Sequence, residues 1–330
     1  MKYFCLALLL FLIKTSSAQT LKYYVSHDGH LVPEKQGAAG YIYVQQLSDS
    51  AYKVSQYDMG DTLLSYSYYK DAKLTIPVGK FGVYQRAVYY NPVTHKDTAG
   101  TYLQQTGYFE NGKRTGTWVV FTANNRKESE TYYENGQENG QHIIYNYVDG
   151  SITIETMKND MPVGSRYMYS EDSVLIVESK YEKGHIEDLK EHTQYPDFQH
   201  AFYTYLEKNL LSYKEVLMKS SLLLHFTVTE GGKIADPMII KGVNAEVDSA
   251  MIAVLKNAPP IAPAKCDGKI TKFRTGQMFT LYRPYHSIAS SHPLTSWQVP
   301  HQRIQTQTYS TVGTMSNGGP TLIEYRVPSQ

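Results

Sequence analysis

Hydrophobic and polar positions recur along the middle of the chain with a fixed spacing of 24 residues. Three segments align at this step, residues 107–121, 131–145 and 155–169, and a weaker fourth covers residues 179–191. In each segment an aromatic-rich stretch runs into a short polar turn and then into an alternating stretch that ends on an aromatic residue. Strict alternation of apolar and polar positions is typical of a half-buried β-strand, so each segment predicts a β-hairpin.

The turn residues strengthen this prediction. Asn111-Gly112 and Asn135-Gly136 are dipeptides that favour a tight hairpin, because both central residues can adopt positive φ. Asp160 and Gly184 stand at the equivalent places, and a second small residue recurs four positions later as Gly116, Gly140 and Gly164. One hairpin cannot bury its hydrophobic face alone, so neighbouring hairpins should stack side by side.

The repeated unit resembles the MORN-variant repeats, and the resemblance covers residues 68–191. Residues 76–84 closely match residues 161–169, which indicates a further copy upstream. The resemblance implies an elongated, twisted antiparallel β-sheet, and it implies no single function, since such repeats serve as spacers and as binding surfaces. Residues 19–67 also alternate, for example from Tyr41 to Leu47, and we expect a β-rich region that begins the same sheet.

The pattern changes after Lys190. Phe202, Leu206 and Leu210 recur at intervals of four, which is typical of a helix, here expected over residues 198–211. Strands are expected over residues 222–228 and 233–240, then a helix over residues 245–258 that Pro259 and Pro260 end. A last strand is expected over residues 272–282. Helix, hairpin, helix and strand in this order predict an α+β domain, so the fold class is mixed.

Residues 192–283 carry a series of short motifs in a characteristic order. They are, in chain order, Tyr195-Pro196, Tyr205-Leu206 with Asn209-Leu210, Phe226 with Val228, Glu230-Gly231-Gly232-Lys233-Ile234, Ile239-Ile240-Lys241-Gly242-Val243, Val247-Asp248 with Ala250 and Lys256, and Pro259 to Lys269. In order and spacing they resemble the TonB C-terminal domain, in its Bacteroidetes-type form. Ile261, Ala264 and Ser220 depart from that family, which has tryptophan, glycine and glycine at these places.

This resemblance implies that the last strand lies at a sheet edge and that an extended peptide of a partner adds beside it. The competing hypothesis is that this strand only completes the sheet, or that residues 284–330, a polar tail of expected low order, cover it. The partner would be a protein, an outer-membrane receptor or its periplasmic segment. The residues expected to bind it are Lys272, Phe273, Arg274, Thr275, Gln277, Phe279 and Leu281.

The N-terminus predicts export. Lys2 precedes an apolar run over residues 3–13, and small residues at Ser16 and Ala18 fit the positions before a signal-peptidase cut. An uncleaved anchor is the alternative, but a spanning helix needs about 20 apolar residues and Lys14 interrupts this run earlier. We therefore expect a signal peptide over residues 1–18, no direct inner-membrane anchor after cleavage, and a place in the periplasm or at the outer-membrane periphery of a Gram-negative bacterium.

Composition and motifs narrow the function class. A formal net charge of +1 argues against nucleic acid as a partner, because a nucleic-acid binder carries a basic patch. The 30 tyrosines favour β-structure. We find no phosphate-binding loop, HExxH, CxxC or nucleophile elbow, and a lone S-x-x-K at Ser50 to Lys53 lacks its companion motifs. His185, His192 and His200 lie near Glu187, Asp188 and Glu191 and could ligate a metal, but the spacing fits no known site, so we interpret them as part of a solvated linker. We interpret Trp118 as a sheet-surface residue.

The sequence therefore predicts no enzyme, no catalytic residues, no cofactor and no metal site. The first hypothesis is an exported TonB-like envelope protein that binds protein partners by β-strand addition to its last strand. The alternative is an accessory energy-transducing component of TonB-dependent outer-membrane transport, which would need attachment to the inner membrane. A free Cys266 is the only cysteine expected in the mature chain, so no intrachain disulfide can form.

Overall fold

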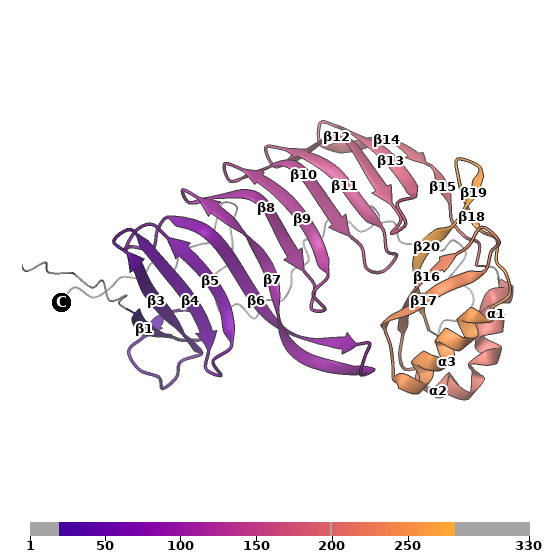
Figure 1. The fold of residues 1–330 in the computed structure, drawn as a ribbon, viewed down its shortest axis with the longest axis horizontal. Helices are drawn as coiled ribbons and strands as arrows, with labels where there is room; N and C mark the ends of the chain where they lie inside the picture. The colour runs from indigo at the N-terminus through magenta and orange to yellow at the C-terminus, as the bar shows by residue number, and fades with distance from the viewer. Residues whose placement is uncertain (1–19, 199, 281–330) are drawn as a thin grey trace, which may run out of the picture.

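The predicted hairpins join into one open antiparallel sheet (Figure 1). The structure is a computed structural model that describes residues 20–198 and 200–280. Of the described residues, 58% lie in strands and 11% in helices, so this part of the chain is mainly antiparallel β-structure, as predicted. The 14 strands of the large sheet are β1 (Thr20–Val25), β2 (Leu31–Val32), β3 (Gly40–Ser48), β4 (Ala51–Asp58), β5 (Leu63–Tyr69), β6 (Pro77–Asn91), β7 (Lys96–Glu110), β8 (Lys113–Phe121), β9 (Lys127–Glu134), β10 (Gln137–Tyr145), β11 (Ile152–Lys158), β12 (Met161–Tyr169), β13 (Leu175–Glu182) and β14 (His185–Glu191).

Chain order and spatial order agree along this sheet. From β4 to β13 every strand pairs with the strand before it and the strand after it. At the first end β1 lies between β3 and β2, and at the other end β14 pairs with β13. The expected boundary at residue 67 falls inside β5, so the N-terminal region and the repeats share one sheet. Residues 185–191 belong to the weak fourth repeat and form the last strand of the sheet, as its hairpin predicts, so they are not a linker, although all seven are exposed.

The turn chemistry of the repeats behaves as predicted. Asn111 and Gly112 have φ of 49° and 83°, and Asn135 and Gly136 have φ of 53° and 91°. Two residues with positive φ form the hairpin turn whose twist matches that of the flanking strands. Gly116, the second glycine of its unit, has φ of 64°, and the pairing of β7 with β8 shifts beside it, between Thr106 and Tyr108. The second small residue thus marks a β-bulge.

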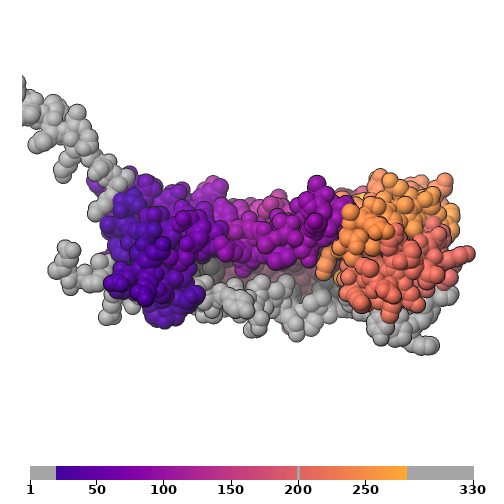
Figure 2. Space-filling view, turned by 90° about the horizontal axis from the view of Figure 1, so that it is seen from below, coloured from indigo at the N-terminus to yellow at the C-terminus, as the bar shows by residue number. Residues whose placement is uncertain are grey.

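The hairpin of β6 and β7 is longer than the others. Each of the two strands has 15 residues, against seven to nine in β8 to β14. The tip, around residues 91–96, extends beyond the other strands and bends toward the C-terminal unit (Figure 1). Seen from below, the large sheet is a narrow slab that ends at that unit (Figure 2).

Trp118 is buried, and its interpretation as a surface residue was wrong. Its side chain is 2% exposed and packs edge-on against Phe109, with ring centroids 5.0 Å apart, and beside Phe81. A Cβ on Gly107 would overlap the indole ring, so the small residue on the neighbouring strand makes the room. The Arg114 guanidinium lies 4.4 Å from the ring centroid and covers the exposed side.

Polar residues take the place of Trp118 in the next two repeats. His142 and Arg166 stand at the equivalent positions and flank the buried Glu155, with His142 Nδ1 3.3 Å from Glu155 Oε1. The Tyr181 hydroxyl donates a hydrogen bond of 2.7 Å to Glu155 Oε2. Burial acts to raise the pKa of Glu155, but the contacts with His142 and Tyr181 outweigh it and hold that pKa below its usual value.

The C-terminal unit has the predicted order of helix, hairpin, helix and strand, with additional short elements. Its main sheet has the strand order β17–β16–β20, and a second sheet has the order β15–β18–β19. Cys266 lies in β18 and is a free thiol. The elements are β15 (Thr193–Gln194), α1 (His200–Asn209), η1 (Leu211–Tyr213), α2 (Lys214–Leu217), β16 (Leu222–Val228), β17 (Ile234–Lys241), α3 (Ala245–Lys256), β18 (Ala264–Cys266), β19 (Lys269–Thr271) and β20 (Phe273–Phe279).

The helices pack on one face of the main sheet and form the largest core. Leu206 of α1, Met251 of α3 and Phe226 of β16 are each at most 2% exposed and belong to one cluster. Helix α3 begins after Asn244, whose side chain accepts a hydrogen bond of 2.9 Å from the Val247 amide, as an N-cap does. None of the helices in the described ranges is both long and apolar enough to cross a membrane.

Candidate functional site

The last strand, β20, lies at the edge of the main sheet of the C-terminal unit, as predicted. Among the residues that the structure describes it pairs with β16 only, in a register that places Thr275 opposite Phe226 and Phe273 opposite Val228. The strand is shorter than predicted, because Lys272 precedes it and Thr280 follows it. Leu281, one of the residues expected to bind a partner, lies outside the described residues.

Most of the predicted binding residues do not present their side chains to the edge. Phe273, Thr275 and Phe279 are buried, and Gln277 between them is half-buried. Alternate residues of a strand face opposite sides, so these four share the face that packs on the helices or on neighbouring core. A partner strand would therefore reach them through the backbone.

Arg274, Gly276 and Met278 occupy the other face of β20. Met278 is exposed over 59% of its surface, and the sequence analysis missed it because a methionine in an alternating stretch does not reveal its face. Gly276 was missed as well. Its amide points away from β16 and donates a hydrogen bond of 3.0 Å to the carbonyl of Asp149, which lies between β10 and β11. By alternation, the Met278 amide also points outward.

The partner of Gly276 belongs to a well-defined loop, residues 146–151. The Asn146 amide donates to the Ser151 carbonyl at 2.8 Å, and the Asp149 carboxylate accepts from the Ser151 amide at 2.8 Å. Gly150 provides a positive φ of 74° at the turn. Asp149 is 9% exposed, and burial raises the pKa of its carboxyl group. Hydrogen bonds within the loop therefore fix its conformation, and the loop packs in that conformation against the edge of β20.

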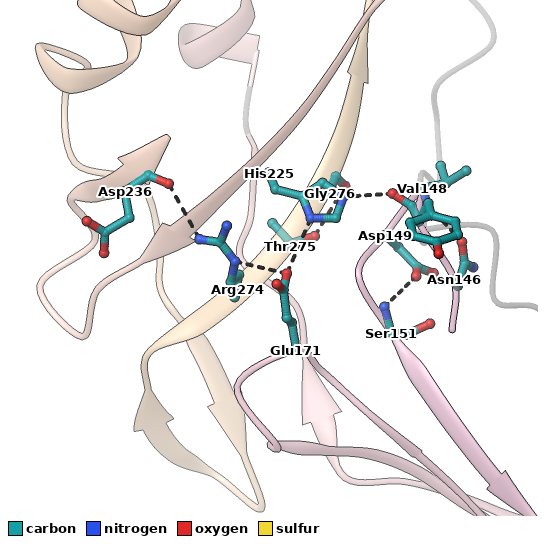
Figure 3. A network of polar contacts seen from close by, with 11 residues as sticks. Asn146, Val148, Asp149, Ser151, Glu171, His225, Asp236, Arg274, Thr275 and Gly276 are labelled. Atoms are coloured by element: carbon teal, nitrogen blue, oxygen red, sulfur yellow. Dashed lines mark hydrogen bonds and ion pairs between the residues drawn. The ribbon is translucent and has the colours of Figure 1, made fainter. Parts of the chain in front are cut away.

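One side chain, His225, bonds to the loop, and Glu171 and Arg274 support it from the other side (Figure 3). The His225 ring, on β16, lies with Nε2 2.7 Å from the carbonyl oxygen of Tyr147, so this nitrogen donates. On the other side of the ring, Nδ1 lies 3.3 Å from Glu171 Oε2. Arg274 Nε donates to the same oxygen at 2.9 Å. Glu171, from the loop between β12 and β13, thus joins β16 and β20 to the large sheet.

A shallow, open depression of about 530 Å³ adjoins Arg274 on this face. It mixes carboxyl groups with two basic side chains and two threonines. Within residues 20–198 and 200–280, no group of three His, Cys, Asp or Glu side chains is placed to hold a metal ion. His192, considered from sequence as a ligand, instead contacts Asp267, with Nδ1 3.0 Å from Oδ1. The depression is lined by Asp172, Thr227, Thr229, Glu230, Gly231, Ala235, Asp236, Lys272 and Arg274.

A second contact joins the C-terminal unit to the tip of the β6–β7 hairpin. The Tyr90 hydroxyl donates to Asp248 Oδ2, and His95 Nδ1 lies 2.9 Å from the same oxygen. The other carboxylate oxygen of Asp248 accepts from the Val243 amide at 2.9 Å. A Cβ on Gly242 would overlap both the Tyr90 hydroxyl and the Asp248 carboxylate, which explains why this position holds a glycine.

The described surface therefore offers an edge strand whose middle is engaged by the chain's own loop. It assembles no nucleophile, base and oxyanion donor in the usual catalytic arrangement among the contacts of the described residues. A scan against models of known families finds no match to the chain, and no curated protein matches its sequence.

Proposed function

We propose that this chain is a non-enzymatic protein of the bacterial cell envelope that binds a protein partner by strand addition to β20. The observation that carries the proposal is the regularity of this edge. β20 has seven residues, no proline and no residue with positive φ. Edge strands that are not used for pairing are commonly blunted by proline, charge or bulges.

Two other edge strands, β17 and β14, are blunted in these ways. β17, at the opposite edge of the same sheet, contains Pro237 and has Asp236 at a φ of 48°. β14, at the end of the large sheet, has Asp188 at a φ of 50° and is made mostly of charged residues. A flat, regular edge such as β20 is a template for an extended peptide, because its outward amides and carbonyls can continue the ladder.

We also propose that the C-terminal unit is related to the TonB C-terminal domain. The roles of the motif residues support this relation. Gly242 allows the close approach of Tyr90 and Asp248, and Asp248 itself accepts from the Val243 amide at the start of α3. Gly232, at a φ of 77°, accepts a hydrogen bond of 2.9 Å from the Ile261 amide through its carbonyl oxygen. Conformational requirements of this kind account for glycine and aspartate at fixed places in a motif.

The proposed location and partner follow from the N-terminal sequence. Residues 1–19 lie outside the described range, and their charged, apolar and small-residue segments support export through a signal peptide. The large sheet, with its MORN-like repeats, would then act as a stalk that carries the C-terminal unit. The partner class is a protein with an extended segment exposed to the periplasm, such as an outer-membrane receptor.

A proline substitution at one position of β20 tests the proposal. Met278→Pro removes an outward amide without removing a hydrogen bond to β16, whereas Met278→Ala keeps the amide. Immobilised full-length chain of each kind is incubated with envelope extract of the native host, and the bound proteins are identified by mass spectrometry. We expect Met278→Ala to retain the partner that the unchanged chain captures and Met278→Pro to lose it. Equal recovery by the two variants would refute strand addition at this edge.

A further inference from the structure

We propose that the loop of residues 146–151 is a built-in competitor for the edge of β20, so that a partner strand must displace it. This inference rests on the proposed function, because it concerns the same edge. It adds that the chain holds this edge closed when no partner is present. The loop comes from the large sheet and the edge from the C-terminal unit, so displacement would also loosen the contact between these two parts.

The loop occupies the one place on β20 that strand addition cannot avoid. The amide of Gly276, at the centre of the strand, already donates to the Asp149 carbonyl. One N–H donates to one good acceptor, so a partner carbonyl could bind there only after Asp149 withdraws. The loop also fills the space beside the glycine, because a Cβ built there would overlap the Val148 carbonyl oxygen and lie 2.9 Å from His225 Nε2.

The part of β20 beyond the loop is too short to bind a strand by itself. Three residues of the strand precede Gly276 and three follow it, and each side directs one amide outward, that of Arg274 and that of Met278. Strands in proteins most often have about 5–6 residues, more than either side of Gly276 offers. A partner strand of ordinary length therefore has to extend over Gly276 and meet the loop.

Glu171 stabilises the contact between the loop and the C-terminal sheet through His225 and Arg274. Its Oε2 atom contacts both Arg274, at 2.9 Å, and His225, at 3.3 Å. His225 in turn donates to the Tyr147 carbonyl within the loop. The Glu171 side chain is 44% exposed, so it can be changed without opening the core. Exposed contacts of this type contribute little individually, which suits a contact that a partner has to break.

The loop stays a separate element from the sheet that it covers. Its internal hydrogen bonds connect residues 146, 149, 150 and 151 to one another. Only the Asp149 carbonyl and the Tyr147 carbonyl are bonded to the strands of the C-terminal sheet, through Gly276 and His225 (Figure 3). Withdrawal of the loop therefore breaks few hydrogen bonds and leaves the pairing of β16 with β20 intact.

Hydrogen exchange of the full-length chain tests whether the loop can be released. Gly276→Ala puts a methyl group where the Val148 carbonyl lies, and Gly231→Ala is the matched control, since the nearest atom to its added Cβ is 4.0 Å away. Glu171→Gln is a milder second variant in case Gly276→Ala fails to fold. We expect peptides over residues 146–151 to exchange at least tenfold faster in Gly276→Ala and severalfold faster in Glu171→Gln, with α3 unchanged and no effect of Gly231→Ala.

Crosslinking then tests competition with a partner. A photo-crosslinking residue replaces Met278 in every variant, and the adducts formed in cells of the native host are compared. We expect the yield of the same adduct to rise in the order of loop exchange, from Gly231→Ala through Glu171→Gln to Gly276→Ala. Equal adduct yields in all variants would contradict the proposal that the loop competes for the edge of β20, and they would leave the proposed function unaffected. Absence of any adduct would refute the proposed function and the competitor with it, and unchanged loop exchange in Gly276→Ala would overturn the competitor alone.

Discussion

Removing one hydroxyl group should loosen the contact between the β6–β7 hairpin and the C-terminal unit. Tyr90, near the end of β6, is 8% exposed, and its hydroxyl donates to the carboxylate of Asp248, which is 1% exposed. Tyr90→Phe keeps the ring in the hydrophobic cluster of the C-terminal unit and deletes only the contacts of the hydroxyl, with Asp248 and with His95 Nδ1 at 3.1 Å. Burial and the bond to Asp248 raise the pKa of Tyr90, so the hydroxyl stays protonated under any ordinary assay condition.

The size of the effect follows from the partners that Asp248 retains. A hydrogen bond to a charged group contributes about 1.5–3 kcal/mol. The carboxylate is not left unpaired in the variant, because His95 Nδ1 and the Val243 amide remain within 2.9 Å of its oxygens. We therefore expect a loss of about 2 kcal/mol rather than the upper figure. Since about 1.4 kcal/mol is a factor of ten, the hairpin should open roughly 30 times more often.

Hydrogen exchange with mass spectrometry measures this opening at neutral pH. The informative peptides cover residues 86–99, at the hairpin tip, and residues 243–249, at the start of α3. Local opening and global unfolding both become easier in Tyr90→Phe, so exchange should accelerate by either route. Tyr89→Phe is the control, because the side chain of Tyr89 lies on the opposite face of the hairpin, beside Gly100. Exchange within threefold of the unchanged chain at both places would refute the reasoning.

Three further predictions concern charge and processing. Glu155→Gln should lower the free energy of unfolding by about 2 kcal/mol at neutral pH, because it removes the charge that His142 and Arg166 face. The folded-state pKa of Glu155 is depressed, so its contribution is present above the unfolded pKa, and urea titrations should show the difference between the two proteins shrinking as the pH falls through the folded pKa. Asp149→Asn should act in the opposite sense, because burial raises the pKa of Asp149 and its stabilising, protonated form is lost as the pH rises. The variant should be the more stable one at neutral pH in the same titration, and no more stable in acid. N-terminal sequencing of the mature chain should begin at Gln19, and a start at Met1 would contradict export by cleavage.

Local chemistry made the hairpins predictable. Asn111-Gly112 needs only its own two residues to form the turn, and the same holds for every later copy, so the sheet could be predicted from repetition alone. Helix α3 was predictable for a similar reason, because Asn244 begins it and Pro259 follows its end. Both signals depend on neighbours in sequence, which is why the predicted bounds lie within a few residues of those observed.

Contacts between distant segments could not be predicted in this way. Gly276 meets Asp149, and Tyr90 meets Asp248, across separations of 127 and 158 residues. Nothing in the alternation of β20 reveals that its middle is engaged, since a glycine in a strand also fits a bulge or a bend. The burial of Trp118 was hidden for the same reason, because it depends on Gly107 of a neighbouring strand and on the Arg114 side chain above the ring.

These two polar contacts between the C-terminal unit and the large sheet should open together. The unit has one core, in which α1, α3 and the main sheet share buried side chains, so it moves as a body. The Tyr90 contact joins that body to the long hairpin, and the Gly276 contact joins it to the loop of residues 146–151. If the body undocks as a whole, weakening either contact makes the same opening easier, and Tyr90→Phe should also accelerate exchange in the loop.

The size of this remote effect distinguishes joint from independent opening. Joint opening predicts that Tyr90→Phe accelerates exchange at the loop by the same factor, roughly 30, as at the hairpin tip. Independent opening predicts no change at the loop, because sites that share no partner act additively and separately. Glu171→Gln provides the reciprocal measurement, since it should accelerate exchange at residues 91–96 only in the joint case. A partner that displaced the loop would then also free the long hairpin, and binding at β20 would be transmitted to the large sheet at two places.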